Sequence, residues 1–390
     1  MLQTGALNNT KLERVVYGRP CAETLAAEAV RRGADRVFLI VSGTLNRETD
    51  VIDRVRAALG PRYAGLYDNV PAHTPRDAVV KAAAAARAAG ADLLATIGGG
   101  SVTDAGKVVQ ICLQHNVTDV SALDAYRIVV NDDGSRHAPT YEGPAVRQIS
   151  VPTTLSGGEF NPLGGCTDGA RKVKEGYRHE LTVPLAVILD PAISVHTPEW
   201  LWLSTGVRAL DHAVEGLCSI KSNPYSDGML MHALRLLQSG LPGVKADPTD
   251  LEARLECQIG MWMAMSGVVA GVPMGASHAI GHILGGTCDV PHGHTSCVML
   301  PNVLRYNASV NGDRQRLVSE AMGRPTEPAA DAVGAFIAGL GMPTTLTDVG
   351  VGADQFPLIA KNSMHDHWVH TNPRKIENAD AVMEILKMAA

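Results

Sequence analysis

Four histidines in the second half of the chain have the spacing of a chemical site. His278 and His282 are four residues apart, so a helix would place both imidazoles on one face. His292 follows in a Pro-His-Gly sequence, and His212 lies in an earlier segment with helical spacing. Imidazoles on facing helices can bind a metal ion or a substrate carbonyl group, and they transfer protons near neutral pH. Any one of them alone would be interpreted as a hydrogen-bonded core residue, but the group favours a functional site.

The other histidines of this region are interpreted as structural. His294 lies close to His292 and should point in another direction. His365, His367 and His370 form a looser group that is more typical of a solvated loop. The candidate site is therefore limited to the first group.

A run of glycines marks a second candidate site, in the first half of the chain. Gly98, Gly99 and Gly100 stand between a predicted buried strand and a predicted helix, and Ser101 follows them. Glycine lets the backbone approach a pyrophosphate closely, and the N–H groups at a helix start attract its negative charge. A tight turn is the structural alternative, but a position at the carboxyl end of a parallel strand favours phosphate binding. The run is not a GxGxxG sequence and follows the third predicted strand, so a standard Rossmann domain fits poorly.

A second loop of small and hydroxyl-bearing residues follows a later predicted strand. It contains Thr153, Thr154, Leu155 and Ser156, followed by two glycines. Paired hydroxyl groups and glycines can bind a ribose or a diphosphate, although a Ser/Thr turn is the structural alternative. Because the glycine run precedes it in the chain, we favour the interpretation of this loop as a second contact with the dinucleotide.

The elements that must position these loops alternate between strands and helices. Apolar runs predict strands at residues 36–42, 64–67, 92–97, 148–152 and 186–189, and helical spacing predicts helices at 48–59, 76–89 and 102–115. This order predicts a parallel sheet with crossover helices. Residues 116–145 break the pattern with a turn cluster at 131–135, flanked by runs that can pair as a hairpin. We interpret them as an insertion or lid-like excursion.

After Asp190 the strand patterns nearly vanish and amphipathic segments follow. They predict helices at residues 206–219, 224–239, 250–269, 277–284, 314–322 and 329–340. The length of 390 residues fits two domains better than one. We therefore predict an α/β dinucleotide-binding domain at residues 1–193 and an all-helical catalytic domain at residues 194–390.

The composition limits the kinds of partner. The net charge of −6 disfavours nucleic acids and anionic membranes, both of which attract basic surfaces. The seven cysteines are scattered and never spaced as CxxC, which is typical of reduced thiols in a cytoplasmic protein. The first residues lack a signal-peptide pattern, and no apolar run approaches the roughly 20 residues that span a bilayer. We expect a soluble cytoplasmic protein with a small-molecule substrate.

Taken together, these motifs resemble the iron-containing (group III) alcohol dehydrogenase-like family. The sequence GGGSxxDxxK at 98–107, the Pro-Thr-Thr loop, Ile-Leu-Asp-Pro at 188–191 and the His-x-x-x-His…Pro-His-Gly block occur in the family's order. The resemblance extends from Val15 to Arg374. It implies a dehydroquinate synthase-like fold, a homodimer, and hydride transfer with NADH or NADPH in a cleft between the two domains.

Within this family the chain is most similar to the maleylacetate reductases. The similarity is carried by residues 156–164 and 167–172, by Arg-Ala-Leu-Asp-His at 208–212, and by Asn-Pro-Arg at 372–374. It implies reduction of maleylacetate, an unsaturated keto-dicarboxylate from aromatic-ring degradation, to 3-oxoadipate.

Arg208 departs from the metal-dependent members of the family, which carry an aspartate ligand at that position. Asp211 is adjacent to His212, so on a helix it should point about 100° away and not replace the missing ligand. His212, His278 and His292 could still hold zinc or iron, but a guanidinium group beside them would repel a dication. The same group suits a bidentate contact with a substrate carboxylate. We expect an anion-binding, proton-donating site that does not require a metal; a surface-exposed Arg208 is the alternative.

A second departure concerns the cofactor. The first predicted strand ends in Ser42-Gly43, where many NAD-preferring members carry an aspartate for the ribose hydroxyls. Without that carboxylate a 2′-phosphate is tolerated, so NADPH becomes acceptable alongside NADH. The insertion at 116–145 is longer than the resemblance implies and can cap and reshape the cleft.

These features give a hypothesis for the role of each residue. The predicted cofactor contacts are Ser42, Gly99, Gly100, Ser101, Asp104, Thr153, Thr154, Leu155, Ser156 and Lys174. The predicted catalytic group is Arg208, His212, His278, His282 and His292. Arg208, with Lys174 or His282, binds the substrate carboxylates, and His278 or His282 donates the proton.

Three other functions remain as alternatives. The first is a metal-dependent alcohol or aldehyde dehydrogenase that binds its metal at the three histidines. The second is a lyase related to dehydroquinate synthase, which would need more basic phosphate-binding residues than the sequence offers. The third is a nucleotide-binding protein without catalytic activity. Turnover-coupled loss of nicotinamide absorbance distinguishes an oxidoreductase from the second and third.

Overall fold

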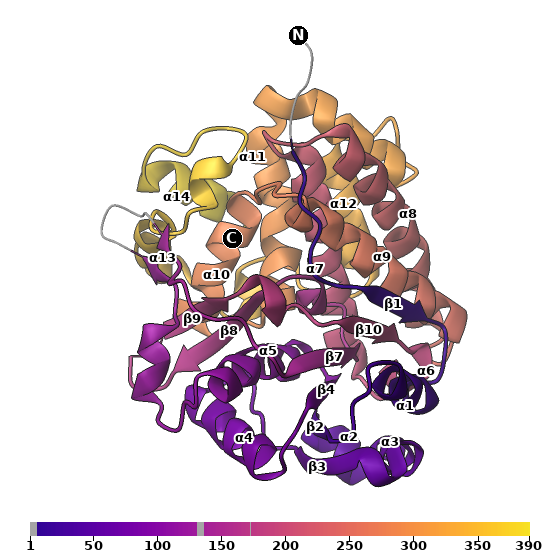
Figure 1. The fold of residues 1–390 in the computed structure, drawn as a ribbon. Helices are drawn as coiled ribbons and strands as arrows, with labels where there is room; N and C mark the ends of the chain where they lie inside the picture. Colours follow the sequence, from indigo (N-terminus) through magenta and orange to yellow (C-terminus); the bar gives the residue numbers. More distant parts are fainter. Residues whose placement is uncertain (1–5, 131–135, 172) are drawn as a thin grey trace. The chain divides into compact units, whose positions relative to one another are not determined.

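The computed structural model describes residues 6–130, 136–171 and 173–390, which form two compact units (Figure 1). An α/β unit comprises residues 10–197, and a helical unit comprises residues 198–390 together with residues 6–9. The boundary predicted after residue 193 falls within helix α6 (Pro191–Ser194), and the structure divides after Thr197. This short helix therefore belongs entirely to the α/β unit.

Among the described residues, six strands form one parallel sheet in the α/β unit. Their order across the sheet is β1 (Arg14–Tyr17), β10 (Ala186–Leu189), β7 (Arg147–Pro152), β4 (Leu93–Gly98), β2 (Val37–Val41) and β3 (Tyr63–Tyr67). Every neighbouring pair is parallel, which confirms the predicted sheet, and β1 adds a strand that the sequence did not predict. Gly98 lies opposite Pro152 in the register of β4 and β7, so the loops after these strands leave the same edge side by side.

Helices pack on both faces of this sheet, which explains why its strands are apolar throughout. They are α1 (Cys21–Arg31), α2 (Gly43–Glu48), α3 (Val51–Leu59), α4 (Arg76–Ala88), α5 (Gly100–Gln114) and α6. Successive side chains of β2 point to opposite faces. Leu39 belongs to the core formed with α1 and α3, and Phe38 belongs to the core formed with α4 and α5.

Antiparallel hairpins extend the α/β unit. β5 (Val129–Val130) pairs with β6 (Arg136–His137) in the predicted insertion, and the predicted turn at 131–135 lies outside the described residues. β8 (Leu163–Asp168) pairs with β9 (Val173–Arg178). The sequence did not predict this second hairpin, because glycines and charged side chains obscure the alternation of its buried residues.

Arg76 joins the insertion to the β8–β9 hairpin through buried ion pairs. Its side chain is 2% exposed, and its guanidinium nitrogens lie 2.8 Å from Asp124 Oδ1 and 3.2 Å from Asp168 Oδ2. Glu175 also contacts this guanidinium group, and Arg171 adds contacts of 2.6 Å to Asp124 and 2.8 Å to Asp168. The arginines therefore occupy the space between three carboxylates and fix the insertion against the hairpin.

Arg76→Met should destabilise the protein strongly. The three carboxylates would remain close together with less positive charge, and removing one partner of a buried ion pair costs roughly 3–5 kcal/mol. Urea unfolding followed by circular dichroism measures the change in the free energy of unfolding. Arg54→Met is the matched control, because Arg54 and Asp50 form an exposed pair that contributes little. Equal effects of the two substitutions would contradict a stabilising role for the Arg76 network.

The helical unit contains a set of longer helices. They are α7 (Glu199–Cys218), α8 (Pro224–Ala246), α9 (Leu251–Val269), α10 (Ala276–Cys288), α11 (His292–Ala321), α12 (Ala329–Gly339), α13 (Phe356–Ser363) and α14 (Ala379–Met388). Every helix predicted for this half corresponds to one of them, although residues 314–322 form only the end of α11. Helices α10, α11, α13 and α14 share one apolar core. No helix within the described ranges is both long and apolar enough to cross a membrane.

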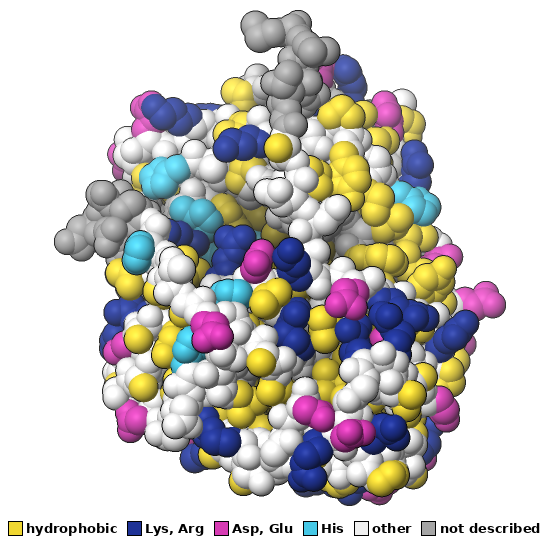
Figure 2. Space-filling view, in the orientation of Figure 1, with side chains coloured by type: hydrophobic (Ala, Val, Ile, Leu, Met, Phe, Trp, Pro, Cys, Tyr) yellow, Lys and Arg dark blue, Asp and Glu magenta, His cyan; other side chains and the backbone are white. Residues whose placement is uncertain are grey.

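Short 3₁₀ helices complete the described chain. They lie at Gly60–Arg62, Ser121–Ala125, Gly158–Phe160, Glu180–Thr182, Thr347–Val349, Ala353–Gln355 and Val369–Thr371. On the face shown in Figure 2, Lys and Arg side chains lie among Asp and Glu side chains.

Candidate active site

The glycine run lies where β4 ends and α5 begins. Gly98 is the last residue of β4, and Gly99 precedes the first turn of the 15-residue helix α5. A Cβ atom at Gly99 would lie 3.1 Å from Thr154 Cγ2, and one at Gly100 would lie 3.3 Å from Ser156 Oγ. The glycine run and the Thr-rich loop are therefore packed closely together, and a side chain at either glycine would push against the Thr154 or Ser156 side chain.

These two loops fit the pyrophosphate and sugar of a dinucleotide. Thr153 N donates to Gly98 O at 3.0 Å, and Thr154 Oγ1 lies 2.8 Å from Ser156 Oγ. Ser101 lies in the first turn of α5, where the helix dipole and the backbone N–H groups attract anions. The structure thus brings together a glycine cradle, a long helix N-terminus and a pair of hydroxyl groups.

The remaining predicted cofactor residues lie around this cradle. The backbone N–H of Ser42 donates to Ile97 O in β4 at 2.8 Å, so Ser42 lies at the end of β2 beside the glycine run. Asp104 and Lys174 lie close together, because a Cβ at Gly165 would be 3.3 Å from Asp104 Oδ2 and 2.5 Å from Lys174 Cε. Leu155 is fully buried, so its side chain belongs to the core and only its backbone can face a ligand.

Glu159 is a buried acid beside the Thr-rich loop that the sequence did not predict. Burial raises its pKa to about 7, and Oε1 has no hydrogen-bond partner within the described part of the chain. The neighbouring Lys107 is also buried, and its ammonium group donates to Gly158 O at 2.5 Å and to Leu163 O at 2.7 Å. Lys107 therefore ties the loops that follow β7 to helix α5.

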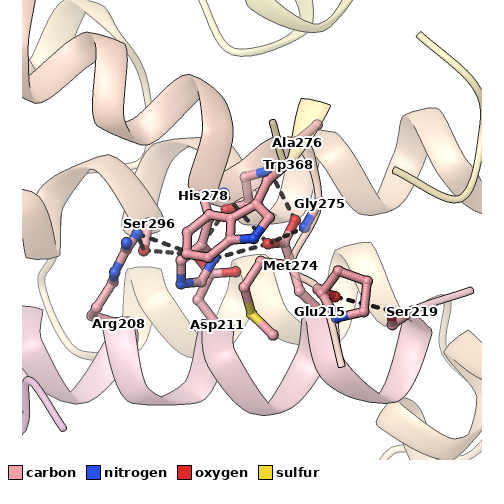
Figure 3. A network of polar contacts seen from close by, with 12 residues as sticks. Arg208, Asp211, Glu215, Ser219, Met274, Gly275, Ala276, His278, Ser296 and Trp368 are labelled. Atoms are coloured by element: carbon pink, nitrogen blue, oxygen red, sulfur yellow. Dashed lines mark hydrogen bonds and ion pairs between the residues drawn. The ribbon is translucent and has the colours of Figure 1, made fainter. Parts of the chain in front are cut away.

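Arg208 and Asp211 project from α7 into the interior of the helical unit (Figure 3). Arg208 Nη1 lies 3.0 Å from Ser296 Oγ and 3.9 Å from Asp211 Oδ2, and 10% of its side chain is exposed. Asp211 Oδ2 accepts hydrogen bonds from Ser277 Oγ at 2.8 Å and Ser296 Oγ at 2.6 Å. Arg208 is thus not the surface residue of the alternative interpretation. It is a buried cation.

Glu215 and His278 form a buried pair next to this network. Glu215 accepts hydrogen bonds from the backbone N–H groups of Gly275 and Ser277, each at 2.9 Å, and lies 2.8 Å from His278 Nδ1. The backbone donors use both carboxylate oxygens of Glu215, and Glu215 and His278 Nδ1 share one proton at this contact. His278 Nε2 is buried and has no hydrogen-bond partner among the described residues.

The electrostatics of the site keep these imidazoles neutral. Burial, followed by the charge of Arg208, lowers the pKa of His278 well below its usual range. The same two causes lower the pKa of His212 to about 3. Burial also raises the pKa of Asp211 and Glu215. Since an arginine stays protonated in proteins, Arg208 is the fixed positive charge of this group.

His282 has a different environment, because its ring contacts an ionised carboxylate. His282 Nδ1 lies 2.9 Å from Asp366 Oδ2, and 33% of the histidine side chain is exposed. Burial acts to raise the pKa of Asp366, but hydrogen bonds from His282 and His367 hold it below its usual range. An ionised aspartate favours the protonated form of a neighbouring imidazole. Of the two proposed proton donors, this geometry favours His282 over His278.

The predicted histidines come together around Trp368. The ring centroid of His278 lies 4.5 Å from that of His212 and 5.5 Å from that of Trp368. The ring centroid of His282 lies 5.2 Å from that of Trp368 and 5.9 Å from that of His292. The indole ring of Trp368 therefore lies close both to His278, which is buried, and to His282, which is partly exposed.

The residues present do not form an ordinary metal site. Within the described residues, the ligand atoms of His212, His278 and His292 do not all lie within 4.8 Å of one another. Asp211, Glu215 and His278 do satisfy that distance, so Asp211 approaches His278, a contact that its position next to His212 did not predict. However, backbone donors already occupy both oxygens of Glu215, hydroxyl donors occupy Oδ2 of Asp211, and the Arg208 guanidinium group lies beside Asp211. The donor set thus fits a hydrogen-bonded network around a cation better than a dication.

Several residues of this site were not predicted from the sequence. Asp366 and Trp368 belong to the segment that was expected to be a solvated loop, and His365 and His370 are indeed exposed there. Glu215 had a usable signal, because positions 208, 211 and 215 share one face of a helix. Ser277 and Ser296 gave no such signal, because they lie on different helices, α10 and α11.

Family models match almost the whole chain. Residues 13–191 match the model described as iron-containing alcohol dehydrogenase, and residues 202–390 match the C-terminal model of the Fe-containing alcohol dehydrogenase family. Dehydrogenase FUM7 from Gibberella moniliformis is 32% identical, with 96% of each chain covered. Maleylacetate reductase 1 from Cupriavidus pinatubonensis is 31% identical, with 96% of this chain and 94% of the relative covered.

Solved structures agree with this assignment. Maleylacetate reductase from Rhizobium sp. strain MTP-10005 superposes with a TM-score of 0.83 at 28% identity, covering 100% of this chain and 98% of that one. These findings confirm the predicted fold, the resemblance to maleylacetate reductases and the assignment as an oxidoreductase. The chain belongs to the iron-containing alcohol dehydrogenase family.

Proposed function

We propose that this oxidoreductase reduces maleylacetate to 3-oxoadipate with NADH or NADPH. Its relatives include maleylacetate reductases at about 30% identity, which supports this substrate class. Fungal dehydrogenases are equally similar, so the substrate must be argued from the site. A role in the degradation of aromatic compounds belongs to the same proposal.

The buried cation Arg208 is the observation that carries the proposal. The imidazoles around it are neutral at pH 7, because burial and the charge of Arg208 lower their pKa values. A guanidinium group in a water-poor environment binds a carboxylate through short, bidentate hydrogen bonds. A dicarboxylate substrate is therefore better matched to this site than an uncharged alcohol or aldehyde.

The residues also account for the steps of the reaction. Reduced nicotinamide adds a hydride to one carbon of the double bond, and the electron pair moves to the ketone as an enolate. Arg208 offsets the negative charge of the bound substrate, and His282 donates a proton to the other carbon. Asp366 holds the His282 ring in position and stabilises its protonated form.

No step of this proposal passes through a metal ion. The family name implies iron, but Arg208 stands beside the carboxylates and histidines that a dication would need. The Arg208 guanidinium group then stabilises the negative charge that a metal ion would otherwise stabilise.

The proposal is tested by steady-state oxidation of NADH and NADPH in the presence of maleylacetate. We expect substrate-dependent loss of the nicotinamide absorbance and, by nuclear magnetic resonance, formation of 3-oxoadipate. Propionaldehyde serves as the uncharged comparison and should react far more slowly. Turnover of the aldehyde without turnover of maleylacetate would instead favour an alcohol dehydrogenase.

A further inference from the structure

Arg47 folds back over the carboxyl end of strand β2. It lies near the end of α2, the short helix that begins at Gly43 immediately after this strand. A Cβ atom at Gly43 would lie 2.4 Å from Arg47 Nη2 and 2.7 Å from Nη1. The guanidinium group therefore rests on the backbone of Gly43, in space that any other residue at position 43 would fill.

Asp68 holds this guanidinium group without burying it. Arg47 Nη1 lies 3.0 Å from Asp68 Oδ2, and Asn46 Nδ2 donates to the same oxygen at 2.9 Å. Asp68 follows strand β3, the neighbour of β2 in the sheet. The Arg47 side chain nevertheless remains 59% exposed, so it can still bind an anion. Asp68 thus orients the cation at the edge of the sheet.

This edge also carries the glycine cradle. β2 and β4 are parallel neighbours, with Val41 opposite Ile97 at their carboxyl ends. A Cβ atom at Gly98 would lie 3.4 Å from Ser42 Cβ, so the residue before Gly43 touches the start of the glycine run. In sheets of this type, a dinucleotide with its pyrophosphate on one loop places its adenosine ribose near the end of the adjacent strand.

We propose that Arg47 binds the 2′-phosphate of NADPH and makes NADPH the preferred cofactor. This inference rests on the proposed use of a nicotinamide dinucleotide. Ser42 offers no carboxylate that would repel the 2′-phosphate, and Arg47 supplies a cation beside it. The rival occupant of this position is the ribose hydroxyl of NADH. Its natural acceptor would be Asp68, but Oδ2 of that residue is already shared by Asn46 and Arg47.

Calorimetric titration with 2′,5′-ADP and with 5′-AMP tests this proposal, since the two ligands differ only in the 2′-phosphate. We expect the protein to bind 2′,5′-ADP roughly 10- to 100-fold more tightly than 5′-AMP. Arg47→Gln should remove most of this difference and leave the affinity for 5′-AMP unchanged. Arg54→Gln, which removes an exposed arginine paired with Asp50, is the matched control and should preserve the difference.

Equal affinities in the unmodified protein, or a ratio that Arg47→Gln does not change, would overturn the assignment. The experiment needs no substrate, so its result is independent of whether maleylacetate is reduced. Discrimination that depends on Arg47 would support the 2′-phosphate site even if maleylacetate proved to be the wrong substrate.

Discussion

Replacing Arg208 by methionine should raise the KM for maleylacetate by roughly 100-fold, because each hydrogen bond to a charged group contributes roughly 1.5–3 kcal/mol. The dimethyl ester of maleylacetate retains the double bond and the ketone without negative charge. Its kcat/KM should change by much less. Steady-state kinetics with the acid and the ester, measured on both proteins, separates the loss of carboxylate binding from a general loss of activity.

The fold should tolerate this substitution. Asp211 would lose the cation that lowers its pKa, and since burial already raises that pKa, the carboxyl group can take up a proton. The serine hydroxyls that contact Asp211 would remain. Circular dichroism checks that the variant is folded. Lys245→Met, which removes a half-exposed cation paired with Glu199 elsewhere in this unit, is the matched control.

An equal loss of activity with the acid and the ester would contradict the carboxylate role of Arg208. Arg208→Lys provides a further test, because a lysine retains the charge but cannot form the bidentate contact. We expect an intermediate KM for this variant.

Replacing His282 by glutamine should lower kcat with maleylacetate by roughly 100- to 1,000-fold, the usual contribution of a general acid. The binding of the dinucleotide should not change. Asp366→Asn should have a smaller effect on kcat and should move the alkaline decline of the pH profile to lower pH. The reason is that a neutral amide no longer stabilises the protonated ring of His282.

The controls for this prediction come from the same cluster. His367 also lies near Asp366, at 3.5 Å, and His367→Gln should change kcat little. His278→Gln tests the other predicted donor, whose Nε2 is buried and whose ring has a lowered pKa. If His278→Gln abolished activity while His282→Gln retained it, the assignment of the proton donor would be wrong.

Much of the fold could be predicted because its signals are local. β2 and β4 are continuous apolar runs, and the helices of the second half repeat their apolar residues at helical spacing. The β8–β9 hairpin gives no such signal, since its charged residues are buried only through partners distant in the chain. Arg76, for example, reaches Glu175 across 99 positions.

In the candidate site, too, the features with local signals were predicted and the contacts between distant residues were not. The placement of His278 and His282 on one helix face follows from their spacing. The glycine run, between a predicted strand and a predicted helix, predicts a phosphate-binding turn. Asp366 lies 84 positions from His282, so only the folded chain reveals their contact. The approach of Asp211 to His278 was not predicted, for a related reason. Helical geometry gives its angle to His212, but the hydroxyl groups of other helices decide which side of α7 faces the site.

The most direct test of the central claim is the dependence of maleylacetate reduction on metal. The protein would be treated with a chelator, its metal content measured, and its activity recorded before and after the addition of zinc or iron. We predict undiminished reduction of maleylacetate by the metal-free protein and no gain from either ion, because Arg208 supplies the charge of the site. Loss of activity on chelation, restored by iron or zinc and accompanied by turnover of simple aldehydes, would contradict this account and show that the histidines bind a catalytic metal.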